Sequence, residues 1–485
     1  MPSLNESTVE DAALGWFEEL GYARTNGLLI APGEPVSERT SFSEVMLRGR
    51  LRDAIGRLNT VIPHEAQEEA LRKVLLADMP SLIGNNRQLH RLLRDGVEVE
   101  YKRADGSIAG NRVRLIDFNN PDANDWLAAN QFTVIEGQHN RRPDIVVFVN
   151  GIPLTVLELK NAADENATIW SAYEQLQTYK AEIPSLLHYN ALLVVSDGLQ
   201  ARVGSLTANQ EWFKVWRTID GERDAPKSAL ELEVLIRGVF EKRRFLDLIQ
   251  HFIAFDEDPD SGAVQKIIAG YHQFHAVNAA VEETVRASGM AEASAAHLAK
   301  QELGEYWVGR MHDGRPGDKR AGVVWHTQGS GKSLSMLFYA ARIVRHLAMQ
   351  NPTLVVLTDR NDLDDQLFGQ FQRCHDILGQ MPVQAEDRVH LRELLSVASG
   401  GVVFTTIQKF LPAKNLPLTP VLSPTGGEGV VRALSERRNI VVIADEAHRS
   451  QYDLIDGLAR HMRDALPNAS FILFSSVDGD ETAAN

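Results

Sequence analysis

Short apolar runs recur along the chain and are separated by polar, turn-forming segments. They occupy residues 145–149, 154–159, 192–195, 323–325, 354–357, 402–404, 440–443 and 471–474. Runs of this length with polar boundaries are typical of buried strands. From residue 323 onward they alternate with helix-forming stretches such as 333–349 and 451–466. The second half is therefore predicted to contain βαβ units around a parallel sheet, whereas the closer spacing of the earlier runs indicates an α+β arrangement.

The segment 256–262 is acidic, contains proline and glycine, and offers nothing to bury. It predicts a break, with a first domain at residues 1–258 and a second at residues 259–485 that opens with the helix-patterned stretch 264–304. A chain of 485 residues is long enough for two to three domains. Residues 417–430 are rich in Pro and Gly and predict a surface insertion.

Composition narrows the class of protein. The formal net charge of −15 argues against a freely adhesive nucleic-acid binder. It does not exclude DNA held in a local basic channel, and the clusters Arg141-Arg142 and Lys242-Arg243-Arg244 could serve one or could be plain solvated surface. The single cysteine, Cys374, excludes a disulfide framework. Without an apolar run of membrane length or a signal-peptide pattern in residues 1–20, the sequence predicts a soluble, cytoplasmic protein.

A glycine-rich loop follows the apolar run 323–325 and precedes a helix-forming stretch. Glycines allow backbone N–H groups to converge on phosphates, and the helix N-terminus adds favourable partial charge. His326 occupies the first glycine position of the usual pattern, and the alternative is a glycine-rich helix start that binds no nucleotide. The predicted ATP-binding residues of the loop are Thr327, Gly329, Ser330, Gly331, Lys332 and Ser333, with Lys332 on the phosphates and Ser333 on Mg²⁺.

A second apolar run, 440–443, ends in Asp445-Glu446-Ala447-His448. Two adjacent carboxylates at the carboxyl end of a strand suit the switch region of a nucleotide-binding sheet. Asp445 is predicted to hold the Mg²⁺ shell, and Glu446 to orient and deprotonate the attacking water. Taken alone, the tetrapeptide could instead be a helix N-terminus that carries acidic residues.

With these motifs in view, the chain resembles superfamily-2 translocases and, more narrowly, the restriction (R) subunit of type I restriction-modification enzymes. The resemblance rests on WHTQGSGKS (325–333), LTDRNDLDDQ (357–366), TTIQKF (405–410) and ADEAHRSQ (444–451). It implies a RecA-like ATP-binding motor domain, with Arg360, Thr405 and Thr406 near the DNA track. It also implies that Gln273 reads the adenine of ATP, although a helix-surface glutamine is the alternative.

The first domain looks like a PD-(D/E)xK nuclease core. Arg142-Pro143-Asp144 leads into the run 145–149, Asn150-Gly151 follows, and a second strand ends in Glu158-Leu159-Lys160. This chemistry needs two carboxylates for Mg²⁺, here Asp144 and Glu158, and a lysine near the nucleophile, here Lys160. The alternative for Glu158 and Lys160 is an edge-strand charge pattern.

Strand register gives this hypothesis a strict test. A regular two-residue hairpin at Asn150-Gly151 would set Asp144 opposite Leu157 and away from Glu158. Metal binding therefore requires a three-residue loop or a one-residue bulge, which would set Asp144 opposite Glu158. Pro153 cannot donate to the strand ladder and favours an irregularity there. We predict that offset.

Downstream, Gln175 and Tyr179 are spaced i and i+4, on one helix face. They resemble the QxxxY element of RecB-like nucleases, which supports the site and the DNA strand. Family nucleases often carry a further upstream carboxylate, and Glu10, Glu65 and Glu68 are candidates. Each of them could equally be a helix-surface residue.

The resemblance stops near the C-terminus, where the sequence reads Ser475-Ser476-Val477-Asp478-Gly479-Asp480 and ends at Asn485 without the family's continuation. We therefore expect truncation after the first RecA-like domain, with impaired ATP hydrolysis and translocation. The predicted function is that of an ATP-dependent translocase and endonuclease subunit that cleaves double-stranded DNA with Mg²⁺. The resemblance implies methyltransferase (M) and specificity (S) subunits as partners. The alternatives are a non-enzymatic docking or DNA-binding fragment, and a helicase or remodeller with an inactive nuclease fold.

Overall fold

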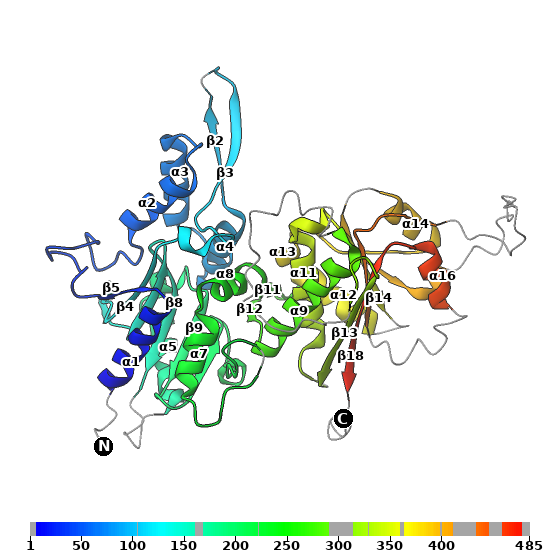
Figure 1. Cartoon of the computed structure of the whole chain (residues 1–485). Helices are drawn as coiled ribbons and strands as arrows, with labels where there is room; N and C mark the ends of the chain where they lie inside the picture. The colour runs from blue at the N-terminus through cyan, green and yellow to red at the C-terminus, as the bar shows by residue number, and fades with distance from the viewer. Residues whose placement is uncertain are drawn as a thin grey trace, which may run out of the picture. The chain divides into compact units, whose positions relative to one another are not determined.

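A computed structural model of the chain describes residues 6–103, 105–160, 168–221, 223–290, 314–327, 329–358, 363–397, 400–410, 433–445 and 458–477. The chain divides into two compact units, Met1–Tyr271 and His272–Asn485 (Figure 1). The boundary expected after residue 258 falls inside a β-hairpin of the first unit.

A mixed six-stranded sheet forms the centre of the first unit. Its strands, in spatial order, are β1 (Ala23–Asn26), β4 (Trp126–Asn130), β7 (Ile145–Val149), β8 (Ile152–Leu159), β9 (Leu192–Ser196) and β10 (Ala201–Gly204). β1 and β4 are parallel, as are β8 and β9, and the other pairs are antiparallel. All eight residues of β8 are buried. A strand buried on both faces is expected to be a continuous apolar run, as this one nearly is.

Helices and small hairpins surround this sheet. α1 and α5 both contact β8, and α1 also packs against α7. The helices are α1 (Glu6–Glu19), α2 (Arg48–Leu58), α3 (His64–Leu75), α4 (Leu82–Asp95), α5 (Ile169–Glu182), α6 (Pro184–Leu187), α7 (Glu231–Val239) and α8 (Lys242–His251), with 3-10 turns η1 (Pro121–Ala123) and η2 (Gln210–Trp212). The hairpins are β2–β3 (Val97–Lys102, Ile108–Val113) and β5–β6 (Val134–Glu136, His139–Arg141). This is the α+β arrangement that the close spacing of the apolar runs predicted.

The turn between β7 and β8 is buried at its tip. Asn150 and Gly151 both have positive φ, +52° and +78°, as a two-residue hairpin turn requires. The Asn150 amide donates to Leu115 O at 2.8 Å and accepts from Asp125 N at 2.7 Å. A Cβ at position 151 would lie 2.4 Å from Leu47 O. Glycine is therefore required there by both the turn and the neighbouring chain.

The segment predicted to be a linker is instead the turn of a hairpin. β11 (Ile253–Glu257) pairs antiparallel with β12 (Val264–Ile268), and Asp258 accepts hydrogen bonds from Asp260 N and Ser261 N across the turn. The helix expected from residue 264 begins later, as α9 (Tyr271–Ser288). Both predictions were wrong for one reason: an acidic Pro/Gly segment marks a tight turn as readily as a domain linker.

The second unit contains a six-stranded, fully parallel sheet. Its spatial order is β13 (Arg320–Thr327), β18 (Ser470–Val477), β17 (Ile440–Asp445), β14 (Thr353–Thr358), β16 (Gly401–Thr406) and β15 (Val383–Gln384). Each of the five apolar runs predicted after residue 323 lies within one of these strands. The predicted parallel sheet with βαβ units is confirmed.

Helices between these strands complete the second unit. They are α11 (Lys332–Arg345), α12 (Leu363–Arg373), α13 (His375–Leu378), α14 (Arg388–Ser396) and α16 (Leu458–Ala465), with 3-10 turns η3 (Leu347–Met349) and η4 (Ile407–Phe410). A buried apolar cluster joins β14, β16 and β17 to α14 and α16. The predicted insertion 417–430 lies outside the described residues. Among the described helices, none is long and apolar enough to cross a membrane.

A lysine of β12 lies entirely within the first unit. The Lys266 ammonium donates to Asn86 Oδ1 at 2.9 Å and to the Asn190 carbonyl, and its side chain lies near the Phe255 ring. Burial lowers the pKa of Lys266 to about 7. Removal from water disfavours the charged amine, and neutral hydrogen-bond acceptors compensate only in part.

Lys266 should make the stability of this unit depend on pH. Above pH 7 the folded amine is neutral, whereas in the unfolded chain it stays protonated to about pH 10. Unfolding therefore takes up a proton in this window, and stability should rise with pH. Urea titrations at pH 7 and at about pH 9.5 measure the free energy of unfolding. Between these two pH values it should rise by on the order of 1–3 kcal/mol more in the wild type than in Lys266→Met. The exposed Lys102→Met is the control, and an identical pH response in both variants would contradict the assignment.

Candidate functional site

The hairpin β7–β8 carries the predicted nuclease residues, and its register confirms the predicted offset. Val149 pairs with Ile152 and Phe148 with Pro153, but Val147 pairs with Thr155 and Ile145 with Leu157. The irregularity lies between Val147 and Phe148 on β7, beside Pro153 on β8. This one-residue bulge sets Asp144 opposite Glu158, one position beyond the Ile145–Leu157 pair.

Both carboxylates are buried and held by short hydrogen bonds. Asp144 and Glu158 are 6% and 3% exposed. Asp144 Oδ2 accepts from Leu159 N at 2.7 Å, so this carboxylate reaches across to the end of β8. Glu158 Oε1 lies 2.7 Å from Lys160 Nζ. Such burial without hydrogen bonds or opposite charge would be strongly unfavourable for ionised carboxylates.

Tyr179 of α5 completes the contacts of Glu158. Its hydroxyl donates to Glu158 Oε2 at 2.9 Å, and burial, followed by the adjacent Glu158 carboxylate, raises the pKa of Tyr179. Gln175, one turn earlier, is hydrogen-bonded to Tyr179. α5 begins at a capping box in which Thr168 and Ser171 satisfy each other's backbone N–H groups, which fixes the start of the helix. Tyr179 thus contacts the Glu158 carboxylate directly, and Gln175 contacts Tyr179.

The three candidate upstream carboxylates have different surroundings. Glu10 on α1 is buried and accepts from Asn130 Nδ2 and Gln131 Nε2. Gln131 N in turn donates to Asp144 O at 3.0 Å, and Gln131 adopts a positive φ of +54°. Glu65 is exposed on α3, and Glu68 pairs with Arg52. Of the three, Glu10 is the one linked to the nuclease hairpin, through the residue that turns at the end of β4.

The donor set of the nuclease hairpin fits a hard divalent cation. Two carboxylate residues occupy opposed positions of the hairpin. Mg²⁺ takes oxygen ligands, usually from one or two carboxylates together with water and substrate phosphate. Within the described ranges, no group of three or more His, Cys, Asp or Glu side chains gathers in a metal-binding arrangement. At this hairpin, Asp144 and Glu158 are the residues that could hold a metal.

The glycine-rich loop of the second unit follows the edge strand β13 and leads into α11. Gly329 and Gly331 have positive φ of +80° and +85°, and Gly331 is the left-handed residue that precedes the helix. Ser330 Oγ is buried and has no hydrogen-bond partner within the part of the chain that the structure describes. Lys332 and Ser333 stand in the first turn of α11. An unsatisfied hydroxyl beside helix N–H groups is suited to an anionic ligand.

Lys332 and Asp445 come together from different parts of the sequence. Lys332 Nζ lies 2.8 Å from Asp445 Oδ1. Asp445 ends β17, which is separated from β13 by the single strand β18. Because these strands are all parallel, their carboxyl ends share one edge of the sheet, where ligands bind in folds of this kind. The predicted convergence of the loop lysine and the strand-end carboxylate is present in the geometry.

The start of α9 packs against this loop. Gln273 Nε2 donates to Gly331 O at 3.1 Å, and His272 Nε2 lies 3.2 Å from Ser330 O. Gln273 is 1% exposed, so the alternative of a helix-surface glutamine is wrong. His272, the neighbour of Gln273 in the sequence, was not among the predicted site residues. Burial, with smaller contributions from His272 and Lys332, lowers the pKa of His326 to about 4.

The remaining predicted residues are divided between described and undescribed segments. Thr405 and Thr406 end β16 at the same sheet edge as Asp445, with Thr405 buried and Thr406 half-buried. Thr327 ends β13, and its side chain is exposed. Arg360 and Glu446 lie outside the described residues.

Comparisons with known proteins agree with this division into two units. The model of the type I restriction enzyme R protein N terminus matches residues 3–212, and the model of the SWI2/SNF2 ATPase matches residues 272–477. The chain thus combines an R-protein N-terminal region with an ATPase domain. A type I restriction enzyme HindI endonuclease subunit of Haemophilus influenzae is 39% identical over 97% of the chain. The provisionally named type I restriction enzyme MjaIXP endonuclease subunit of Methanocaldococcus jannaschii is 33% identical over 98% of the chain.

The chain belongs to the family of type I restriction enzyme endonuclease (R) subunits. It spans 42% of the length of the Haemophilus subunit and 43% of the Methanocaldococcus subunit.

Tyr179→Phe tests the contact with Glu158. The substitution leaves Glu158 Oε2 without its phenolic donor in a buried setting. We expect the free energy of unfolding to fall by about 1–3 kcal/mol. The matched control is Tyr173→Phe on the same helix. The half-buried hydroxyl of Tyr173 donates to Ala208 O at 3.3 Å, and its removal should lower the free energy of unfolding by less. Chemical denaturation of both variants measures the difference, and equal losses would contradict the role given to Tyr179.

Proposed function

We propose that this chain cuts double-stranded DNA with Mg²⁺ through its first unit and binds ATP through its second, as part of a type I restriction system. The observation that carries the proposal is the bulge in β7–β8, which sets Asp144 opposite Glu158 beside Lys160. An edge-strand charge pattern would not require this bulge, and β8 lies inside the sheet between β7 and β9. The register therefore supports a nuclease-type site over a charged edge strand.

The nuclease chemistry follows from these residues. Asp144 and Glu158 would hold Mg²⁺, which supplies a polarised phosphate and a more acidic water when bound. Lys160 would act on the nucleophile, and its ammonium lies 2.7 Å from Glu158 Oε1. Tyr179 and Gln175 would orient Glu158 through the hydroxyl contact. A carboxylate fixed from both sides loses little freedom when it binds a cation.

The ATP chemistry follows from the second unit. Lys332 and the loop residues Thr327, Gly329, Ser330 and Gly331 would bind the phosphates, and Ser333 and Asp445 would ligate Mg²⁺. Gln273 would contact adenine, and its hydrogen bond to Gly331 O ties that contact to the phosphate loop. Glu446 would orient the attacking water. Arg360, Thr405 and Thr406 would lie along the DNA track, at the edge where β16 ends.

The family also suggests the molecular setting. We propose that the chain acts together with methyltransferase and specificity subunits, because the matched relatives are named as subunits of type I restriction enzymes. Sequence recognition would then come from a partner, and the R-type chain would supply cleavage and the motor.

Substitution of the nuclease residues tests the first half of this proposal. Asp144→Ala and Lys160→Ala should each abolish Mg²⁺-dependent nicking of plasmid DNA, because each removes one part of a site that works as a unit. The exposed Lys102→Ala is the charge-matched control for Lys160. Cleavage should be assayed with the chain alone and with added methyltransferase and specificity subunits. Cleavage that survives either substitution, or its absence from the unchanged chain in both settings, would overturn the nuclease assignment.

Lys332→Ala tests the ATP site. Loss of a charge-assisted contact to phosphate is expected to weaken ATP binding by roughly 10- to 100-fold. Lys319→Ala is the control, because Lys319 lies in the same unit and donates to Pro467 O. Titration calorimetry with ATP and Mg²⁺ measures both affinities, and equal affinities in the two variants would remove Lys332 from the site.

A further inference from the structure

Two adjacent arginines precede the metal-binding residue Asp144, and their surroundings differ. Arg141 is paired with Glu182, which also lies 3.5 Å from His139 Nδ1. Arg142 is exposed, and within the described part of the chain it forms neither a hydrogen bond nor an ion pair. Arg141 is therefore held by an ion pair within the protein, whereas the guanidinium of Arg142 is available to a ligand.

Arg142 stands within reach of the cleavage site. It lies two residues before Asp144, so the two Cα atoms are at most about 7 Å apart. Pro143 between them is buried and restricts the backbone of Arg142 to extended conformations. The position of its Cα relative to Asp144 is therefore well defined, while its long side chain remains in solvent.

The negative charge of the proposed nuclease site favours an additional cation such as Arg142 where DNA approaches. Ionised Asp144 and Glu158 bring two negative charges to the site, and Lys160 pairs with Glu158. A DNA backbone that approaches this site brings further negative charge. Arg142 can neutralise a phosphate without giving up any interaction inside the protein, and its planar donors suit phosphate oxygens.

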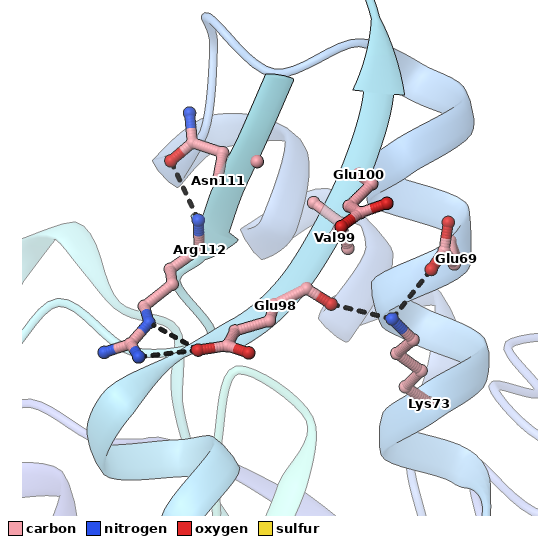
Figure 2. Close-up of a pocket in the computed structure, with 8 residues that line it drawn as sticks. Glu69, Lys73, Glu98, Val99, Glu100, Asn111 and Arg112 are labelled. Carbon is pink, nitrogen blue, oxygen red and sulfur yellow. Dashed lines mark hydrogen bonds and ion pairs between the residues drawn. The ribbon is translucent and has the colours of Figure 1, made fainter. Parts of the chain in front are cut away.

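Three other basic residues of this unit, Lys73, Arg112 and Lys180, have partners within the protein. A cavity of about 870 Å³ beside the β2–β3 hairpin contains Lys73 and Arg112. Figure 2 shows Lys73 bound to Glu69 and to the Glu98 carbonyl, with Arg112 bound to the Glu98 carboxylate. On α5, the half-buried Lys180 donates to Gln177 Oε1, and burial lowers the pKa of Lys180 to about 8. These cations are poorer candidates for DNA than Arg142.

We infer that Arg142 binds a phosphate of the DNA strand presented to Asp144 and Glu158. The inference rests on the nuclease function proposed above. It assigns Arg142 to substrate binding and leaves the metal to the two carboxylates. Arg141, one residue away, has a structural role instead.

The test is the salt dependence of DNA binding. The full chain and its Arg142→Ala, Arg142→Lys and Arg141→Ala variants bind a fluorescently labelled duplex without ATP or divalent metal, across roughly 50–200 mM salt. Loss of one phosphate contact should lower affinity several-fold and make the slope of log K against log salt shallower by about 0.9. Arg142→Lys should retain most of the slope, and Arg141→Ala should retain all of it. Contacts made elsewhere in the chain are common to all four proteins.

The outcomes separate this inference from the nuclease proposal. An unchanged slope in Arg142→Ala, an equal loss in Arg141→Ala, or no binding by the unchanged chain at the lowest salt would each overturn the inference. The nuclease proposal is judged separately, by the effect of Asp144→Ala on plasmid nicking. Thermal unfolding of Arg142→Ala should match the wild type, because an exposed, unpaired side chain contributes little to stability.

Discussion

The register of one hairpin determines whether the first unit can hold a metal. Side chains alternate between the two faces of a strand, so a shift of one residue would turn Asp144 away from Glu158. The bulge beside Pro153 removes that conflict, and the buried turn at Asn150-Gly151 anchors the hairpin at its other end. The hydrogen bond from Leu159 N to Asp144 and the tyrosine contact to Glu158 depend on this offset. The relative placement of Asp144 and Glu158 is thus determined by the pairing of the two backbone strands.

The two units bring charged residues together through different sheet topologies. In the first, antiparallel strands bring two carboxylates together across a hairpin. In the second, parallel strands bring Lys332 and Asp445 to the same edge, although the two are far apart in the sequence. Charged groups meet at both sites, and in each the protein supplies partners for them, with Lys160 and Tyr179 at Glu158 and Lys332 at Asp445.

Most strands of the two sheets and the main residues of both candidate sites could be predicted from the sequence, because strand periodicity and motif spacing depend on local structure. The offset at Asp144 followed from counting residues around Asn150-Gly151, and the contact of Tyr179 with the site from its helical spacing to Gln175. The linker at 256–262 was wrong because a turn inside a domain and a link between domains use the same residues. The burial of Gln273 could not be predicted, because it depends on how α9 packs against a loop nearly sixty residues later in the sequence. Glu10 had no local signal either, since its partners Asn130 and Gln131 are brought to it by the sheet.

The single strand β18, which separates β13 from β17, sets the distance across the proposed ATP site. Two inter-strand spacings amount to about 9.5 Å, a distance set by main-chain hydrogen bonds and not by side chains. The long side chain of Lys332 reaches across this distance to Asp445, and a shorter cation in its place could not. Substitutions can therefore change which side chains line the site, but the distance between β13 and β17 stays fixed as long as the strands remain paired.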